Sequence, residues 1–249
     1  MAARRAYEQG AWVVPEEAAT LLVDAQARWA EDAMLRLLKA RQVGDALAEA
    51  QAQADRAVAM AQWPAARAAL EEWVALQPDA PDVWVRLGDI CQILGELDEA
   101  RAAYQSALAV QPNHSPAQLA LGTLALYQGE PSQAQQHFLD AIRRGAGADG
   151  WAGLSQAQLQ GGQVGAARQS AARALQLDPS NLQARVALAG ALQEMGDWPA
   201  AWAQTVEAAR RWPHAPQPLA AQARLWHDRG EASLAIALLT QALSQTASP

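Results

Sequence analysis

The sequence is poor in cysteine and in long apolar runs. Its single cysteine, Cys91, excludes a disulfide framework within one chain and favours a reducing compartment. No stretch approaches the roughly 18 consecutive apolar residues that a membrane-spanning helix needs. The first 19 residues also lack an apolar run of signal-peptide length. We therefore expect a cytoplasmic protein without a membrane span, or a periplasmic one if the natural chain carries a leader upstream.

Strand signals and a basic surface stripe are absent too. Alternation of β-branched and polar residues never extends beyond three or four positions, whereas alanine, the best helix former, is abundant. The sequence therefore predicts an all-α fold. Its net charge of −7 and pI of about 5.1 argue against nucleic acid as the main partner, because proteins that bind it normally carry a basic stripe.

The residues that enzymes and metal sites use are few and scattered. The four histidines lie far apart, and none is paired with an acid at the helical spacing that a zinc-binding helix needs. They are His114, His137, His214 and His227. Gly161-Gly162 lies between two predicted helices, whereas a phosphate-binding loop follows a strand. We expect no catalytic residue, no cofactor and no metal site, and we interpret His114 and His214 as solvated residues of equivalent turns.

What the sequence does contain is a repeated helical hairpin, seen most clearly in residues 81–114. Apolar residues recur there at three- and four-residue intervals, which places them on one face of each helix. Gly95 interrupts the first helix, and Pro112 ends the unit because proline has no backbone N–H. The marker residues are Trp84, Leu87, Gly88 and Cys91 in the first helix, then Ala100, Tyr104, Ala107 and Leu108 in the second.

The same markers return every 33 or 34 residues. The turn glycines are Gly95, Gly129, Gly162, Gly196 and Gly230, and the matching second-helix alanines are Ala100, Ala134, Ala167, Ala201 and Ala235. Agreement of period and residue type marks a repeat array. The pattern resembles the tetratricopeptide-repeat family, whose motif is matched by Trp84-x2-Leu87-Gly88, Gly95, Ala100, Tyr104, Ala107 and Pro112. This resemblance implies a right-handed α-α superhelix, a solenoid of about six helical hairpins with an extra N-terminal helix.

We divide the chain at residue 46. Residues 1–46 are interpreted as a lead-in and a capping helix that begins near Pro15, where a missing backbone donor is tolerated. Val43-Gly44-Asp45 is expected to turn the chain into the array, residues 47–249. The units of the array are 47–80, 81–114, 115–147, 148–181, 182–215 and 216–249.

Three units of the array depart from the repeat pattern: the first, the third and the last, 216–249, which lacks the closing proline. The first has Ala61 where the turn glycine belongs, as the atypical terminal repeats of stacked arrays often do. The third unit is one residue short and has Ala146 in place of its closing proline. We therefore expect a looser turn, or a hinge, at residues 143–147.

In this family the first helices of the hairpins line a concave groove, and the resemblance implies that a ligand binds there. First-helix residues that are not needed for packing inside the array are the candidate binding residues. They are Val85, Asp89, Gln92, Leu119, Thr123, Leu126, Tyr127, Gln156, Leu159, Gln160 and Gln193. Further first-helix positions of this kind are occupied by Gln51, Asp55, Val58, Ala152, Val186, Gly190, Glu194, Arg224, His227 and Asp228.

The groove residues also narrow the kind of ligand. Relatives that bind chaperone tails hold a peptide carboxylate with Lys, Asn and Arg, but the corresponding positions here are Asp55, Val85, Asp89, Leu119 and Thr123. We therefore do not expect a chaperone tail as the partner. An apolar mid-array groove suits an amphipathic helix or an extended apolar segment. The alternative is that Leu126 and Leu159 only pack between neighbouring hairpins.

The last helix carries more apolar residues than packing within its unit requires. The family's inward pattern accounts for Ala235, Leu239, Ala242 and Leu243. Exposed apolar area beyond such packing usually marks an interface. We therefore predict a weak homodimer or an end-to-end contact, and its candidate residues are Leu234, Ile236 and Leu238.

We interpret the chain as a bacterial, non-enzymatic scaffold or adaptor whose partner is another protein or a peptide. One alternative is that it is the recognition module of a larger enzyme, of the glycosyl- or sulfotransferase type. A reading frame that extends well beyond Pro249 would favour that alternative. The other alternative is a cell-envelope assembly factor, which an upstream export signal would favour.

Overall fold

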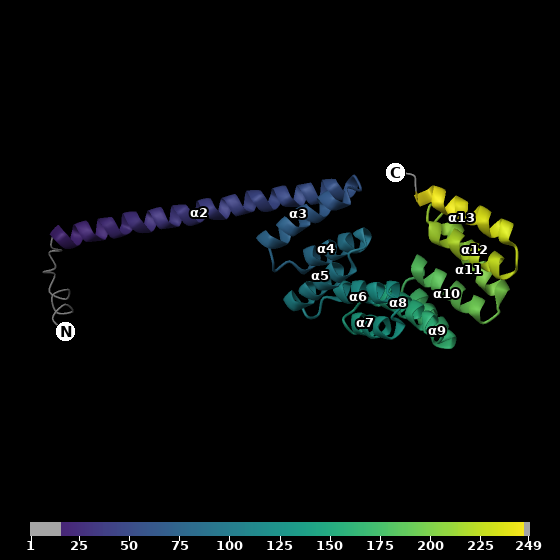
Figure 1. Cartoon of the computed structure of the whole chain (residues 1–249). Coiled ribbons are helices and arrows are strands. Elements are labelled where there is room, and N and C mark those ends of the chain that lie inside the picture. The colour runs from purple at the N-terminus through teal and green to yellow at the C-terminus, as the bar shows by residue number, and fades with distance from the viewer. Residues whose placement is uncertain (1–15, 247–249) are drawn as a thin grey trace.

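The computed structural model describes the chain from residue 16 to residue 246, with side chains for residues 31–36 and 38–244. In this part every regular element is an α-helix, and the helices form six hairpins stacked into a right-handed α-α superhelix (Figure 1). The helices are α2 (Glu16–Ala59), α3 (Trp63–Leu76), α4 (Pro81–Leu94), α5 (Leu97–Val110), α6 (Ser115–Tyr127), α7 (Pro131–Arg143), α8 (Gly147–Gln160), α9 (Val164–Leu177), α10 (Leu182–Glu194), α11 (Trp198–Arg211), α12 (Pro216–Asp228) and α13 (Ala232–Thr246).

Each hairpin turn is closed by the same pair of backbone hydrogen bonds. In the turn between α4 and α5, Glu96 N–H donates to the carbonyl of Cys91 at 2.9 Å, and Gly95 N–H donates to that of Gln92 at 3.1 Å. Gly95 has a φ of 81°, a conformation that glycine adopts without steric cost. The first hairpin has Ala61 at this position, with a φ of 53°. The turn residues therefore set the period of the array.

Glycines on the first helices let bulky side chains of the second helices approach closely. A Cβ added to Gly88 would lie 2.4 Å from Cε1 of Tyr104, and one added to Gly153 would lie 2.3 Å from Cε1 of Phe138. Tyr104 and Phe138 are both buried. The apolar core is a succession of such contacts along the array rather than a single centre, as expected of stacked repeats.

The N-terminal helix differs from the sequence prediction. Helix α2 runs without a break through Gly44, so the expected turn at 43–45 does not form. One glycine inside a helix costs only about 0.5–1 kcal/mol, which the rest of a long helix offsets. Packing against the array begins near Ala46 and Leu47, and Ala50 is fully buried. The part of α2 before residue 46 projects away from the hairpins (Figure 1), so it is not a cap on the first repeat.

One type of hydrogen bond between neighbouring hairpins recurs after two hairpins. Nε2 of His114 lies 2.9 Å from Oδ1 of Asp82, and 67 residues further on Nδ2 of Asn181 donates to Oδ1 of Asp149 at 2.6 Å. This contact buries His114 to 5% exposure, so the expectation that it is a solvated turn residue was wrong. His214 is exposed, as expected. Among the described residues, no equivalent hydrogen bond to a carboxylate of the preceding hairpin is found for it.

The turn at 143–147 is closed as firmly as the others. Ala146 N–H donates to the carbonyl of Ala141 at 2.9 Å and Gly145 N–H to that of Ile142 at 3.0 Å, which repeats the hairpin pattern. Arg144 Nε also donates to the carbonyl of Pro112 in the preceding turn at 3.0 Å. These bonds close the turn without the proline that ends other units, so the looser turn expected here is not observed.

Candidate functional site

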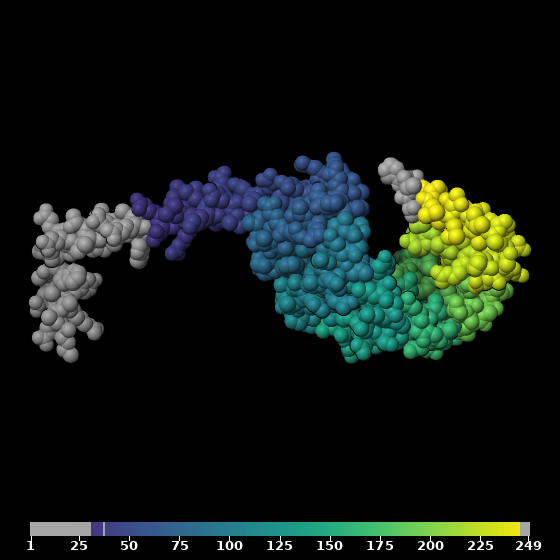
Figure 2. Space-filling view, viewed as in Figure 1, coloured from purple at the N-terminus to yellow at the C-terminus, as the bar shows by residue number. Residues whose placement is uncertain are grey.

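The inner side of the superhelix is hollowed between the N-terminal and the C-terminal hairpins (Figure 2). First helices line this concave side, because each hairpin packs its second helix on the outside of the curve. One pocket of about 410 Å³ lies where four first helices, α6, α8, α10 and α12, face a common space. Its lining residues are Leu126, Gln156, Leu159, Gln160, Val186, Ala187, Glu194 and Arg224.

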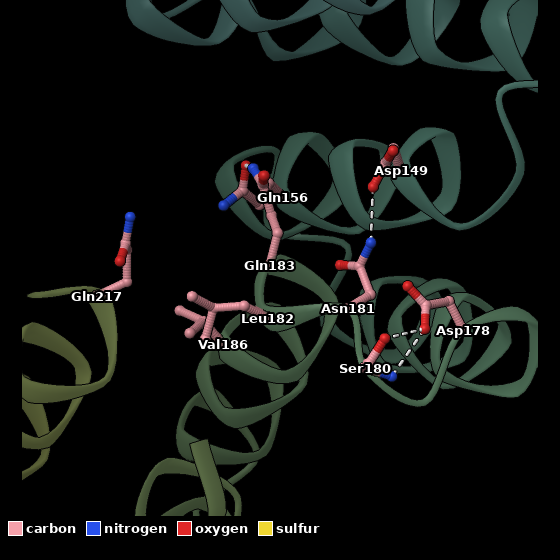
Figure 3. Close-up of a pocket in the computed structure, with 9 residues that line it drawn as sticks. All are labelled: Asp149, Gln156, Asp178, Ser180, Asn181, Leu182, Gln183, Val186 and Gln217. Atoms are coloured by element: carbon pink, nitrogen blue, oxygen red, sulfur yellow. Dashed lines mark hydrogen bonds between the residues drawn. The ribbon is translucent and has the colours of Figure 1, made fainter. Parts of the chain in front are cut away.

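A second pocket, also of about 410 Å³, adjoins the first toward the start of α8 and α10 (Figure 3). It is lined by Asp149, Gln156, Asp178, Ser180, Asn181, Leu182, Gln183, Val186 and Gln217. Gln156 and Val186 belong to both pockets, so the two form one continuous surface. We call this surface the groove.

Glutamine side chains from successive first helices dominate the polar part of the groove. Gln156 on α8 and Gln183 on α10 lie side by side, and Gln217 faces them from α12 (Figure 3). Gln183 Nε2 donates to Oε1 of Gln156 at 3.0 Å, and Gln160 Nε2 donates to the carbonyl of Leu126 at 3.3 Å. An amide carries two donors and one acceptor oxygen. These side chains therefore present the same hydrogen-bonding groups as a peptide backbone.

One end of the groove is acidic. Asp178 follows α9 and accepts hydrogen bonds from Ser180, through its hydroxyl at 2.5 Å and its backbone N–H at 2.8 Å (Figure 3). The hydroxyl bond, then the backbone bond, lower the pKa of Asp178 below its ordinary value. Asp149 is held by Asn181 as described above. The carboxylate of Asp178 is thus charged at neutral pH and faces the groove.

The structure brings together four of the residues that sequence reasoning selected as groove candidates. Leu126, Gln156, Leu159 and Gln160 all line the first pocket, although Leu126 and Leu159 also pack between hairpins. The two leucines therefore serve both as groove lining and as packing between neighbouring hairpins, the two roles that the sequence left open. Val186, Glu194 and Arg224, selected on the same first-helix positions, line this pocket as well.

The other candidates lie outside the two pockets. On α4, Asp89 and Gln92 are both acceptors for the hydroxyl of Tyr104, at 2.8 and 3.2 Å, so they serve packing between α4 and α5. Desolvation raises the pKa of Asp89, while the bond from Tyr104 opposes this shift. The remaining candidates are Val85, Leu119, Thr123, Tyr127 and Gln193, of which Tyr127 is 71% exposed.

Sequence reasoning missed the end of the groove near the helix starts. Asp149, Asn181 and Gln217 lie in the first turn of a first helix or just before it. The sequence did contain a signal for these residues, because an aspartate occupies the same position in two repeats, as Asp82 and as Asp149. That these positions on different hairpins line one pocket depends on the superhelix, which the sequence does not display.

The predicted contact residues of the last helix are only partly exposed. Leu234 and Ile236 face solvent, but Leu238 is half-buried. Leu239 and Leu243, which were assigned to packing inside the unit, are 45% and 68% exposed, so that assignment was wrong. Ala235 and Ala242 do pack inward as predicted. The apolar surface of α13 is therefore larger than the sequence suggested.

The part of the chain that the structure describes contains no cluster of three or more His, Cys, Asp and Glu side chains able to hold a metal ion. None of its helices combines the length and the apolar character that crossing a membrane requires. Cys91 is buried, and desolvation raises the pKa of its thiol. The groove combines two pockets of about 410 Å³ each, with lining residues from four first helices.

Comparison with protein families agrees with the geometry. Two family models, both described as tetratricopeptide repeat, match residues 79–145 and 119–181. Residues 79–181 therefore form a tetratricopeptide-repeat region. Comparison with curated proteins gives no match. The groove of this tetratricopeptide-repeat array lies at the C-terminal end of the matched region and beyond it, with Val186, Glu194 and Arg224 outside both matches.

Several solved structures share the tetratricopeptide-repeat fold. TTC0263, a thermophilic protein of this family from Thermus thermophilus, is 22% identical with a TM-score of 0.61, over 67% of this chain and 91% of that one. PilW, a widely conserved type IV pilus biogenesis factor, is 18% identical with a TM-score of 0.65, over 80% and 92%. The pilF protein of Pseudomonas aeruginosa is 17% identical with a TM-score of 0.61, over 80% and 91%. At these identities the likeness concerns the fold alone.

Proposed function

We propose that the protein is a protein–protein interaction scaffold that holds an extended segment of a partner protein in the groove. Tetratricopeptide-repeat arrays are generally non-catalytic scaffolds, which supports the class of function. The observation that carries the finer proposal is the row of amide side chains, Gln156, Gln183 and Gln217, beside the apolar floor formed by Leu159 and Val186.

An extended segment fits this surface better than a helix. The N–H and C=O groups of a helix are already bonded within it, whereas those of an extended segment need partners. The glutamines offer donors and acceptors to those groups without selecting a side chain. Apolar side chains of the segment would then lie on Leu159 and Val186, as alternate residues of a bound strand do in other recognition modes.

The ends of the groove add a preference for charge. The carboxylates of Asp149 and Asp178 lie at one end, and Glu194 and Arg224 lie at the other. Complementary charges mainly set binding orientation and partner choice. We therefore propose that the segment carries a basic residue at the Asp178 end.

Selection of binders from a randomised peptide display library, with the full chain as bait, tests this proposal. We expect peptides with alternating apolar residues and a basic residue near one end. Gln156→Ala/Gln183→Ala removes about two hydrogen bonds, each worth roughly 0.5–1.5 kcal/mol, so binding should weaken about 5- to 100-fold. The matched control is Leu177→Asp, an exposed position on the second helix α9, which should leave binding unchanged.

The proposal is overturned if the selected peptides bind the double variant as tightly as the original protein. Peptides that become helical on binding would also contradict it, because they would not need the amides. The two alternatives for the whole protein, a recognition module of a larger enzyme and an envelope-assembly factor, stay predictions. The groove would recognise the partner under either alternative, since it belongs to the array.

A further inference from the structure

The protein exposes two apolar surfaces at opposite ends of the array (Figure 1). The first is on the part of α2 that projects from the hairpins, residues 31–45, which we call the arm. Each described side chain of the arm is exposed. Met34, Leu35 and Leu38 lie on one stripe of it, at positions i, i+1 and i+4, and Met34 is 60% exposed.

The stripe does not serve packing of the arm against its own array. Residues 18 positions apart lie on the same side of an α-helix, since 18 residues make five turns. The side of α2 that packs on the array through Ala50 and Ala54 therefore continues in the arm as Asp32 and Arg36, both charged. The stripe centred on Leu38 is rotated by roughly 120° from that side.

The second apolar surface is the outer face of α13. Helix α13 packs on α12 alone among the described elements. Ala232, Ile236, Leu239 and Leu243 follow one another at spacings of four, three and four residues, which is the spacing of a seam between two packed helices. Ile236 is 64% exposed.

Between α12 and α13 lies an apolar hollow of about 580 Å³. It is lined by Ala220, Ala223, Arg224, His227, Ala232, Ala235, Ile236 and Leu239. Elsewhere in the array, the first helix of the next hairpin packs against the preceding hairpin at the corresponding position. The hollow therefore lies where the first helix of a further hairpin would pack, and its lining is apolar as such packing requires.

The arm shares a residue spacing with the buried faces of two first helices. These faces pack partly on their own second helix, as Gln118 does on His137 of α7 at 2.9 Å. Helix α6 buries Ala117, Gln118 and Leu121, and α12 buries Pro218, Leu219 and Gln222, in each case positions i, i+1 and i+4. The stripe of Met34, Leu35 and Leu38 has this spacing. First helices also bury a residue at i+7, such as Leu124 and Leu225, where the arm has Arg41. The match therefore covers about two turns.

We propose that the arm of one copy lies in the hollow between α12 and α13 of a second copy and takes the place of the next first helix. The kind of helix supports this occupant, because the arm is the N-terminal part of α2, which is itself the first helix of a hairpin. Charge does not select it, since Glu31 and Asp32 are balanced near the stripe by Arg36 and Lys39. One copy contributes its arm and the other its hollow, so the contact is head-to-tail. Such a contact can propagate into a chain of copies or close into a ring.

The contact is short, and association is correspondingly weak. Stable interfaces bury roughly 800 Å² per partner, and two turns of one helix supply only part of that area. We expect association that becomes visible at micromolar concentrations and above.

Two double variants and their mixture test the proposal by sedimentation velocity. Leu35→Glu/Leu38→Glu disables the arm, and Ile236→Glu/Leu239→Glu disables the hollow. All four residues are exposed, so both variants should keep the helical circular dichroism of the original protein. We expect concentration-dependent association of the original protein, and at least tenfold weaker association of each variant alone.

The mixture distinguishes head-to-tail docking from self-pairing of either surface. An equimolar mixture of the two variants retains one intact arm and one intact hollow, so it should form 1:1 dimers and nothing larger. Undiminished association of the arm variant alone would show that α13 pairs with itself. Undiminished association of the hollow variant alone would show that the arms pair. Either result, or an original protein that stays monomeric at high micromolar concentration, overturns the proposal.

Discussion

Asn181 links two consecutive first helices through both ends of its side-chain amide. Its Oδ1 accepts a hydrogen bond from the backbone N–H of Ala184 at 2.8 Å and so caps α10, while its Nδ2 donates to Asp149 on α8 at 2.6 Å. One residue thus starts a helix and fixes the neighbouring helix against it. Both bonds border the groove, so the stability of the array and the shape of the site depend on the same side chain.

The first prediction concerns this residue. Asn181→Ala should lower the free energy of unfolding by about 1–2 kcal/mol, because it removes a cap and a hydrogen bond between hairpins. Asn181→Ser is the matched control, since serine can cap the helix but cannot reach Asp149. It should cost about half as much. No loss of stability for Asn181→Ser in urea denaturation would show that the bond to Asp149 contributes nothing, whereas equal losses for the two variants would show that the cap contributes nothing.

The second prediction concerns the close approach of α7 and α8. Gly153→Ala should destabilise the protein by about 1–3 kcal/mol, because its Cβ would lie 2.3 Å from the ring of Phe138. Gly165→Ala in α9 is the control: no atom lies within 4 Å of the added Cβ, and the higher helix propensity should stabilise by roughly 0.5 kcal/mol. Thermal or urea unfolding of both variants checks the opposite signs.

The third prediction concerns the first hairpin turn. Ala61→Gly should stabilise the protein by about 0.5–1 kcal/mol, because Ala61 has a φ of 53° that glycine adopts without strain. The reverse change in an equivalent turn, Gly129→Ala, should destabilise by a similar amount, since Gly129 has a φ of 74°. A fall in stability of Ala61→Gly would mean that loss of backbone entropy outweighs the relief of strain.

The fourth prediction concerns the acidic end of the groove. Ser180→Ala removes the largest cause of the low pKa of Asp178, so that pKa should rise toward its ordinary value. Because the folded-state pKa is depressed, Asp178 contributes stability above the unfolded pKa, and this stability is lost as the pH falls through the folded pKa. The variant should therefore lose less stability on acidification. Carbon-13 NMR titration of the Asp178 carboxyl measures the shift directly, and an unchanged pKa would contradict this assignment.

The sequence alone determined the hairpins, their number and their repeat pattern. Gly95 and the glycines that follow it at intervals of 33 or 34 residues act within a few residues of themselves, through left-handed turns that only glycine adopts freely. The apolar face of each helix is likewise a local pattern. Such signals survive in one sequence because each acts inside one repeat.

The tertiary structure decided what happens between repeats and at the ends of the array. The rotation from one hairpin to the next brings Gln156, Gln183 and Gln217 onto one surface, although each belongs to a different unit. His114 is buried by a contact with a residue 32 positions earlier. Leu239 stands in a position that is covered inside the array, yet it is exposed on α13, the last helix of the array. The physical reason is common to all three: burial depends on which neighbour is present, and one repeat does not encode its neighbour's position.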